Sequence, residues 1–198
     1  LINRLKISKE IDEIILATTS NASDDKLANF VSQLGVNVFR GSENNVLDRF
    51  YKAAKKYKPK IVLRITADCP LIDAGLIDDL ILDFNVNNED YLSNALKPSF
   101  PDGLDCEVFS FEALEKSWKE ATNYHEKEHV TPYIYESGKF KTRNYSSSQD
   151  YSNHRWTVDE ELDFLVIKNI YDYFYPRIDF SWIEILDLHD QRPELFEH

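Results

Sequence analysis

The sequence of 198 residues contains no methionine and only five glycines, and no two of those glycines have the spacing of a phosphate-binding loop. Neither the G-x-G-x-x-G pattern nor the Walker pattern occurs, so two common nucleotide-binding signatures are absent. The chain also lacks a start residue, and residues 1–5 have the apolar spacing of the middle of an amphipathic helix. We therefore expect a chain whose domain begins upstream of residue 1.

Cysteines, long apolar runs and basic stripes are also scarce. Two cysteines, Cys69 and Cys106, are too few for a disulfide scaffold and lack the spacing of a metal finger. No stretch approaches the ~20 apolar residues that cross a bilayer, and no signal peptide is evident. With 35 acidic and 23 basic residues, the net charge of −12 argues against nucleic acid as a partner. We predict a soluble, cytoplasmic, enzyme-like protein with a single domain over residues 1–198 and no membrane association.

Apolar runs alternate with helical patterns along the chain, which is typical of an α/β protein. Strands are predicted at residues 14–17, 36–39, 61–65, 91–92, 104–108 and 154–158. Helices are predicted at residues 27–34, 46–54, 76–84, 111–118, 162–170 and 181–186. Together they indicate an α/β three-layer sandwich with a mainly parallel sheet and a small antiparallel excursion at about residues 90–150.

Two aspartates follow predicted strands, and ligands of open α/β sheets bind beyond the carboxyl ends of the strands. Asp68 ends the strand at 61–65, and Asp159 ends the strand at 154–158. Brought together, they would form an oxygen site for a hard cation such as Mg²⁺, with substrate phosphates as further ligands. Two simpler interpretations stay open, because Asp159 is also suited to cap the next helix and Asp68 could satisfy loop amides.

Several other polar side chains have two interpretations each. Asp105 and Glu107 lie two residues apart on a strand and so share one face, where they would contact a polyhydroxylated ligand or simply water. His129 is either a ligand contact or a surface histidine beside a carboxylate, and Cys106 is expected in the core. Arg40 and Arg49 flank a loop that would hold phosphate or base, or would be solvent-exposed.

Seven short blocks, in order along the whole chain, together resemble the spore-coat-polysaccharide type of cytidylyltransferase. They are IDEIILATT at 11–19, FRGSE at 39–43, VLDR at 46–49, RITADCPLID at 64–73, PDGLD at 101–105, EHVTPY at 128–133 and RWTVDE at 155–160. This group is related to the acylneuraminate and 3-deoxy-manno-octulosonate cytidylyltransferases. The resemblance implies a fold like that of the nucleotide-diphospho-sugar transferases.

The resemblance further implies transfer of CMP from CTP to a sugar acceptor for polysaccharide or glycan biosynthesis, with Mg²⁺ required and pyrophosphate released. In that scheme Asp68 and Asp159 match the catalytic, metal-binding acids. The matching nucleotide-binding residues are Thr18, Arg40, Ser42, Asp48 and Arg49. The matching sugar-side residues are Asn94, Asp102, Asp105, Glu107 and His129. Relatives also suggest a homodimer, with residues 90–150 as the natural interface.

The chain departs from the family pattern at its beginning, where the family has a strand and a loop rich in Gly, Ser, Arg and Lys. Without that loop, we expect this polypeptide to bind CTP poorly. Three alternatives remain: a nucleotidyltransferase for another base, a metal-dependent glycosyltransferase of the related fold, and a non-catalytic truncated partner protein. The glycosyltransferase typically carries an Asp-x-Asp pair, whereas Asp68 is followed by Cys69 and Pro70.

Overall fold

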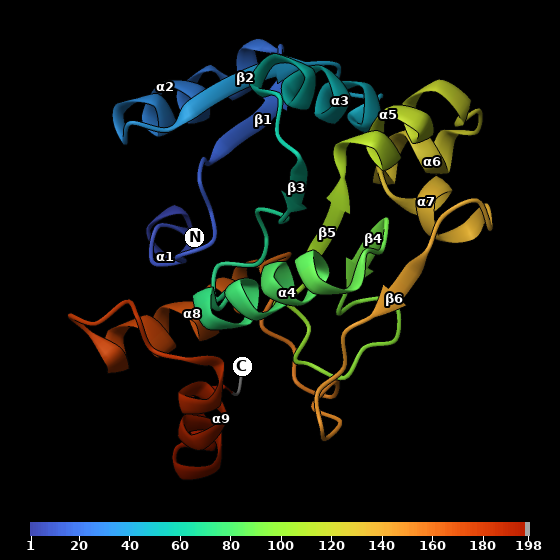
Figure 1. The fold of residues 1–198 in the computed structure, drawn as a ribbon. Helices are drawn as coiled ribbons and strands as arrows, with labels where there is room; N and C mark the ends of the chain where they lie inside the picture. The colour runs from blue at the N-terminus through green and yellow to red at the C-terminus, as the bar shows by residue number, and fades with distance from the viewer. Residues whose placement is uncertain (197–198) are drawn as a thin grey trace.

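Two groups of hydrogen-bonded strands form the framework of the protein, as a computed structural model describes it for residues 1–196 (Figure 1). The first is a two-stranded sheet of β1 (Ile15–Thr19) and β2 (Asn37–Gly41). The second has four strands in the order β3-β5-β4-β6, which are β3 (Ile61–Arg64), β5 (Glu107–Ser110), β4 (Tyr91–Ser93) and β6 (Thr142–Asn144). Among residues 1–196, β1 and β3 do not pair with one another.

The strand directions are mixed, which corrects the predicted mainly parallel sheet. β1 runs parallel to β2 and β4 to β6, whereas β5 is antiparallel to both β3 and β4. The predicted strand at 154–158 is also wrong, because that segment forms only a single bridge between Arg155 and Asp102. The Asp102 N–H donates to the His154 carbonyl, and the Asp102 carbonyl accepts the Trp156 N–H. Both hydrogen bonds of the bridge therefore involve Asp102 alone on that side.

Helices lie on both sides of the strands, and their starts agree with the predicted positions to within two residues wherever an apolar stripe is long. The long helices are α2 (Asp25–Gln33), α3 (Val46–Tyr57), α4 (Ala74–Asn87), α5 (Phe111–Glu120), α8 (Glu161–Phe174) and α9 (Trp182–Gln191). The short ones are α1 (Ile2–Leu5), η1 (Ala22–Asp24), α6 (Tyr124–His129), α7 (Pro132–Glu136) and η2 (Pro193–Leu195). No helix within residues 1–196 is both long and apolar enough to span a membrane.

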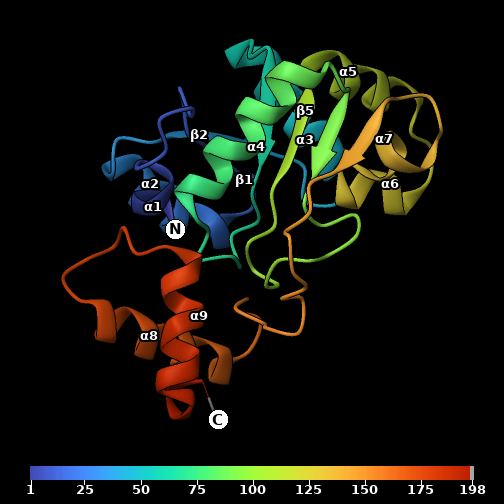
Figure 2. The same cartoon turned by 60° about the horizontal axis from the view of Figure 1, so that its bottom comes forward.

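Two apolar clusters hold these elements together. The larger one joins α4 to the C-terminal α8 and α9, which lie together below the strands in Figure 2, and its members include Leu76, Leu80, Trp156, Ile170 and Ile185. The smaller one packs α3, α5 and α7 around Tyr91 and Phe109 and includes Leu47, Leu114 and Ile134. The loops between these two clusters are therefore supported by packed helices and strands.

The helix α2 has its apolar face in an unexpected position. Leu27, Phe30, Val31 and Leu34 have the spacing of a core stripe, yet of these four only Val31 is buried, and Phe30 keeps 59% of its surface accessible. Ala28 and Val31 are the buried residues of this helix. Periodicity identified the helix correctly but not the side that packs on β1 and β2.

Candidate functional site

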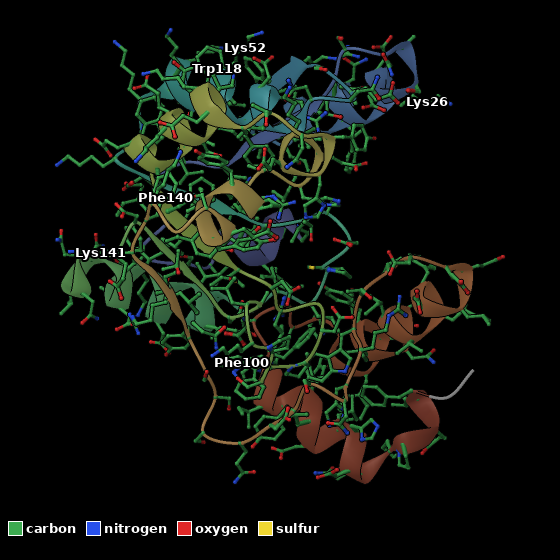
Figure 3. The ribbon with its side chains drawn as sticks, turned by 90° about the vertical axis from the view of Figure 1, so that its right-hand side faces the viewer. Lys26, Lys52, Phe100, Trp118, Phe140 and Lys141 are labelled. Carbon is green, nitrogen blue, oxygen red and sulfur yellow. The ribbon has the colours of Figure 1, made fainter. Side chains whose placement is uncertain are left out.

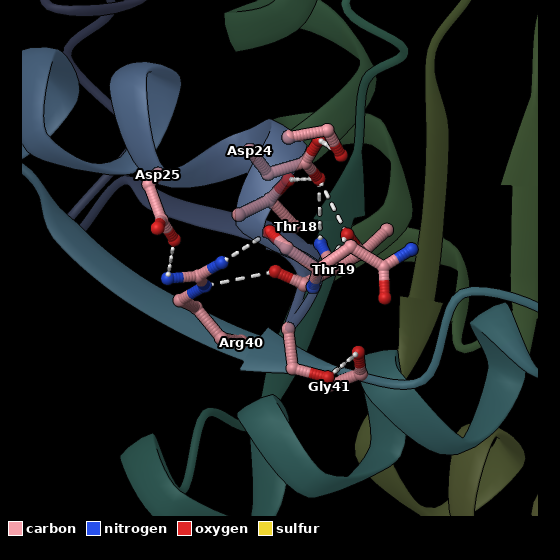
Figure 4. A network of polar contacts seen from close by, with 9 residues as sticks. Thr18, Thr19, Asp24, Asp25, Arg40 and Gly41 are labelled. Carbon is pink, nitrogen blue, oxygen red and sulfur yellow. Dashed lines mark hydrogen bonds and ion pairs between the residues drawn. The ribbon is translucent and has the colours of Figure 1, made fainter.

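The turn after β1 is fixed by a carboxylate that accepts several hydrogen bonds (Figure 4). The Thr18 and Thr19 hydroxyls donate to Asp24 Oδ2 at 2.6 and 2.7 Å, and the Thr19 N–H donates at 3.1 Å. These donors stabilise the charged form and lower the pKa of Asp24 to about 2. Thr18 thus stabilises the turn at the carboxyl end of β1 by its hydrogen bond to Asp24.

Arg40, at the carboxyl end of β2, holds the same turn from the other side (Figure 4). Its guanidinium donates to the Thr19 carbonyl at 2.8 Å and to Asp25 at 2.6 Å. Arg49 donates to the Ser42 carbonyl at 2.6 Å. Within the described chain, Arg49 Nε is buried without a hydrogen-bond partner, and desolvation lowers the pKa of this side chain. Four of the five predicted nucleotide residues therefore lie at or just beyond the carboxyl ends of β1 and β2, namely Thr18, Arg40, Ser42 and Arg49, and Arg49 is the least satisfied of them.

Asp48 lies in the first turn of α3, where the Asn45 side chain caps the helix by accepting the Asp48 N–H at 3.0 Å. The Asp48 carboxylate accepts from the Trp118 indole at 3.0 Å and pairs with Lys52 at 2.7 Å. Figure 3 shows Trp118 and Lys52 side by side on this surface. Asp48 links α3 to α5 here.

A group of carboxylates gathers beyond the end of β3. Asp68 follows that strand, and its backbone carbonyl accepts the Val158 N–H at 2.9 Å, which brings the segment of Asp159 beside it. Burial, together with the charges of Asp159 and Asp68, raises the pKa of Asp102 despite Arg155 nearby. The predicted convergence of Asp68 and Asp159 is therefore present in the backbone, and Asp102 lies with them.

Asp105 is the most perturbed carboxyl group of this acidic cluster. Burial raises its pKa to about 6, and the charges of Asp102, Glu107 and Asp68 act in the same direction. Arg64 opposes the shift more weakly. Like charges held together at a half-buried place are typical of functional sites that bind a cation or transfer a proton.

Arg155 connects three acids of the site, and sequence analysis did not single it out as a site residue. Its guanidinium bonds Asp163 at 2.6 Å and Asp159, and lies 3.9 Å from Asp102. Asp163 also accepts the N–H groups of Asp159 and Glu160, each at 2.9 Å, and these donors with Arg155 lower the pKa of Asp163. Arg155 and Asp159 precede α8 and lie in no helix, so their i, i+4 spacing is not that of a helical ion pair and gave no signal in the sequence.

One interpretation of Asp159, that it caps the following helix, is wrong. The N-cap of α8 is Glu160, which forms a capping box with Asp163, so Asp159 does not cap the helix. Its side chain is 57% exposed and remains accessible next to Arg155. The Asp159 carboxylate therefore lies at the rim of the acidic cluster, where its Oδ2 accepts from Arg155 and not from the helix N-terminus.

Glu107 is buried and its carboxylate is fully engaged. It accepts from Tyr91 at 2.7 Å and from the Thr131 hydroxyl, and it pairs with Arg64. Thr131 follows Val130, whose φ of +73° is rarely adopted by a β-branched residue. Such outliers persist where the surroundings fix them. Glu107 thus fixes Arg64 and Thr131 next to the acidic cluster rather than presenting free oxygens.

Asn94 and His129 make contacts of different kinds. The buried Asn94 amide donates to the Leu104 carbonyl and accepts the Cys106 N–H, both at 2.8 Å, so it shapes the loop that carries Asp105. His129 lies on α6, half exposed, with its Nε2 3.6 Å from Glu128. Cys106 is fully buried in the core, as predicted.

The loop that carries Asp68 is anchored by residues far away in the sequence. Arg4 is almost completely buried, and its guanidinium donates to the Leu71 and Ile72 carbonyls at 3.2 and 2.7 Å. It also donates to the carbonyls of Ile178 and Phe180, at 2.6 and 3.0 Å. The segment after Asp68 is therefore held between the N-terminal helix and the C-terminal part of the chain.

The acidic cluster suits a hard cation in its donor set. Among residues 1–196, no group of three or more His, Cys, Asp or Glu side chains is arranged to hold a metal ion. Mg²⁺, however, is usually held by one or two carboxylates, with water and substrate phosphates completing the octahedron. Asp68 and Asp159 are carboxylates of this kind in neighbouring segments, although Asp159 is paired with Arg155 in this structure. Burial is the main cause of the raised pKa values of Asp102 and Asp105, and the neighbouring carboxylates add to it.

Comparison with known proteins gives consistent relatives. The chain is 41% identical over 198 residues to the uncharacterized protein MJ1063 of Methanocaldococcus jannaschii, which covers 98% of this chain and 80% of the relative. It is 31% identical over 204 residues to the spore coat polysaccharide biosynthesis protein SpsF of Bacillus subtilis, covering 98% and 83%.

Solved structures agree with these relatives. A cytidylyltransferase from Leptospira borgpetersenii has a TM-score of 0.93 at 34% identity, covering 98% of this chain and 82% of that one. A CMP:2-keto-3-deoxy-manno-octonic acid synthetase complexed with CTP has a TM-score of 0.62 at 9% identity, covering 86% and 85%, and shows likeness of fold alone. A family model described as cytidylyltransferase matches residues 1–189. The chain therefore belongs to the cytidylyltransferase family of nucleotidyltransferases.

Proposed function

We propose that the protein is a Mg²⁺-dependent cytidylyltransferase that transfers CMP from CTP to a sugar and releases pyrophosphate, in the synthesis of a surface polysaccharide. The observation that carries the proposal is the acidic cluster of Asp68, Asp102 and Asp105 beside Asp159, at the carboxyl end of β3. The similarity to SpsF, a spore coat polysaccharide biosynthesis protein, supports the polysaccharide assignment.

The reaction asks the protein mainly for positioning and for stabilisation of charge. A sugar oxygen forms a bond to the α-phosphorus of CTP, the bond from that phosphorus to the bridging oxygen breaks, and pyrophosphate leaves with those electrons. Asp68 and Asp159 would hold Mg²⁺, which would neutralise charge developing on the phosphate oxygens. Asp102 and Asp105 would accept hydrogen bonds from the sugar hydroxyls, and Asp105, whose pKa is raised to about 6, would take the proton of the attacking hydroxyl.

The nucleotide side of the site would use the edge formed by β1 and β2. Arg49 is the group best suited to a phosphate, because its Nε has no protein partner within the described residues. Thr18 and Arg40 fix the turn that would face the nucleotide. Ser42 anchors Arg49 and the start of α3 through its carbonyl and hydroxyl oxygens.

The proposal is tested by pyrophosphate release with Mg²⁺, each of the four NTPs and a panel of acidic and neutral sugars. The protein is assayed as its gene encodes it, from the start codon. We expect pyrophosphate release with CTP and one class of sugar. The absence of release with every nucleotide and sugar would refute the proposed activity.

The variant Asp68→Asn tests the metal assignment within the same assay. We expect it to lose most Mg²⁺-dependent turnover while its melting temperature stays close to that of the wild type. Asp12→Asn, at an exposed position before β1, is the matched control and should keep full activity. Full activity in Asp68→Asn would remove Asp68 from the metal site.

A further inference from the structure

Two histidines lie one turn apart on α6. Neither has a role in the reaction proposed above, although His129 is one of the predicted sugar-side residues. His125 and His129 occupy positions i and i+4, and their ring centroids are 4.7 Å apart. Side chains with this spacing project from the same face of a helix. Both imidazoles are about half exposed, so a solvated ion can reach them.

The short helix that carries this pair is fixed at both ends. Its N-terminus has a capping box, in which Asn123 accepts the Glu126 N–H at 2.9 Å and the Glu126 carboxylate accepts the N–H groups of Thr122 and Asn123. Its C-terminus is closed by Val130, with its φ of +73° and a fully buried side chain. The backbone beneath the two histidines is therefore ordered before any ligand binds.

Two carboxylates lie next to the imidazoles, one on the neighbouring helix α7 and one on α6 itself. His125 Nε2 lies 4.0 Å from Glu136 Oε1 on α7, and His129 Nε2 lies 3.6 Å from Glu128 Oε2 on α6 itself. Glu126 is occupied by the cap, so the H-E-x-x-H spelling of residues 125–129 does not provide the free glutamate base of a metalloprotease. The arrangement offers ligands for an ion, and no hydrolytic base.

We propose that His125 and His129 form a binding site for a late first-row divalent cation such as Zn²⁺, with Glu136 or Glu128 and water completing the coordination. Two imidazole nitrogens on one tetrahedral Zn²⁺, each at 2.0–2.1 Å, lie about 3.3 Å apart. Rings at 4.7 Å between centroids reach that separation by side-chain rotation alone. Since no three-ligand cluster is preformed in the part of the chain that the structure describes, a carboxylate has to turn toward the ion on binding.

The donor chemistry distinguishes this site from the acidic cluster. Imidazole nitrogen favours Zn²⁺, Cu²⁺ and Ni²⁺, whereas Mg²⁺ prefers carboxylate, carbonyl and water oxygens. An ion on His125 and Glu136 would also tie α6 to α7 and stabilise the folded state by mass action. The chain would then have a site for Mg²⁺ at the acidic cluster and a separate site for a softer ion such as Zn²⁺ on α6.

Zinc titration of the EDTA-stripped protein tests the proposal, with a chromophoric zinc indicator as competitor and the melting temperature as a second readout. We expect stoichiometric binding, a concentration-dependent rise in melting temperature, and no competition from millimolar Mg²⁺. His125→Gln should weaken the apparent zinc affinity at least about tenfold. Its melting temperature without zinc should match that of the wild type, because His125 is exposed.

The chain offers its own matched control in a second close pair, His154 and His189, whose ring centroids are 4.8 Å apart. His189→Gln should leave the zinc affinity unchanged, and Glu136→Gln should reduce it less than His125→Gln does. Zinc binding that survives in His125→Gln, or that is lost in His189→Gln, would overturn the assignment to α6. Both outcomes are independent of catalytic turnover, so failure of this site and failure of the proposed enzymatic activity can be told apart.

Discussion

Replacing Asp105 by asparagine is expected to stabilise the protein at neutral pH, although it removes a residue of the proposed sugar side. The carboxyl group is half-buried among Asp102, Glu107 and Asp68, and its pKa is raised from the ordinary 3.8 to about 6. Folding therefore disfavours the charged form of this side chain. An amide of the same shape carries no charge and avoids that cost.

The magnitude follows from the linkage between proton binding and folding. A difference of about two pKa units, at about 1.4 kcal/mol per unit, sets an upper limit of about 3 kcal/mol. Water reaches part of the group and screens its neighbours, so we expect a gain of about 1 to 2 kcal/mol. Because the folded pKa lies above the unfolded value, the gain is complete above pH 6 and disappears as the pH falls toward 4.

Urea unfolding of wild type and Asp105→Asn at pH 7.5, 5.5 and 4, in EDTA, measures this difference directly. Asp24→Asn is the control of opposite sign, since its pKa is lowered to about 2 and its charged form stabilises the fold at neutral pH. A loss of stability in Asp105→Asn at pH 7.5, or a gain that does not change with pH, would refute the reasoning. Lower turnover together with higher stability would show that the site retains unfavourable charge for its function.

Two further substitutions test the framework of the site. Arg4→Met should lose about 3–5 kcal/mol in urea unfolding, because it leaves the carbonyls of the Asp68 loop and of the C-terminal segment without their donor, and a loss below about 1 kcal/mol would contradict this. Gly103→Ala should lose about 3 kcal/mol or more by the same measurement, since φ is +101° and a Cβ would lie 2.7 Å from the Trp156 carbonyl carbon. A Gly103→Ala protein as stable as the wild type would show that the loop can move away from Trp156.

The parts of the fold that the sequence predicted are those with local signals. The strand at 61–64 and the helix at 74–87 follow from a short apolar run and a clear 3.6-residue stripe. The adjacency of Asp68 and the Asp159 segment was also predicted, but the strand at 154–158 on which that prediction rested does not form. The Val158 N–H bond to the Asp68 carbonyl and the single bridge at Arg155 hold that segment in place instead. Ser181 and Glu184 form the predicted capping box at the start of α9.

The rest depends on contacts between distant residues. β6 has the sequence Thr142–Asn144, which carries no apolar alternation, and it exists because the β4 edge offers hydrogen bonds. Glu107 looked like one half of a solvated strand face, but Tyr91, Thr131 and Arg64 surround it. Arg155 meets Asp102 only after the chain has folded back over 53 positions. No local sequence pattern predicts contacts between residues so far apart in the chain.

The anchoring of the Asp68 loop by Arg4 has a consequence for how the protein matures. One guanidinium joins residue 4, residues 71–72 and residues 178–180, so its full set of acceptors exists only when nearly the whole chain is present. On the ribosome, residues 1–72 emerge long before Phe180 does, and during that interval the charged group of Arg4 has to remain hydrated. The loop bearing Asp68 thus gains its final anchor late in synthesis. A chain released before residue 180 would lack the Phe180 acceptor of Arg4, and its Asp68 loop would be incompletely anchored.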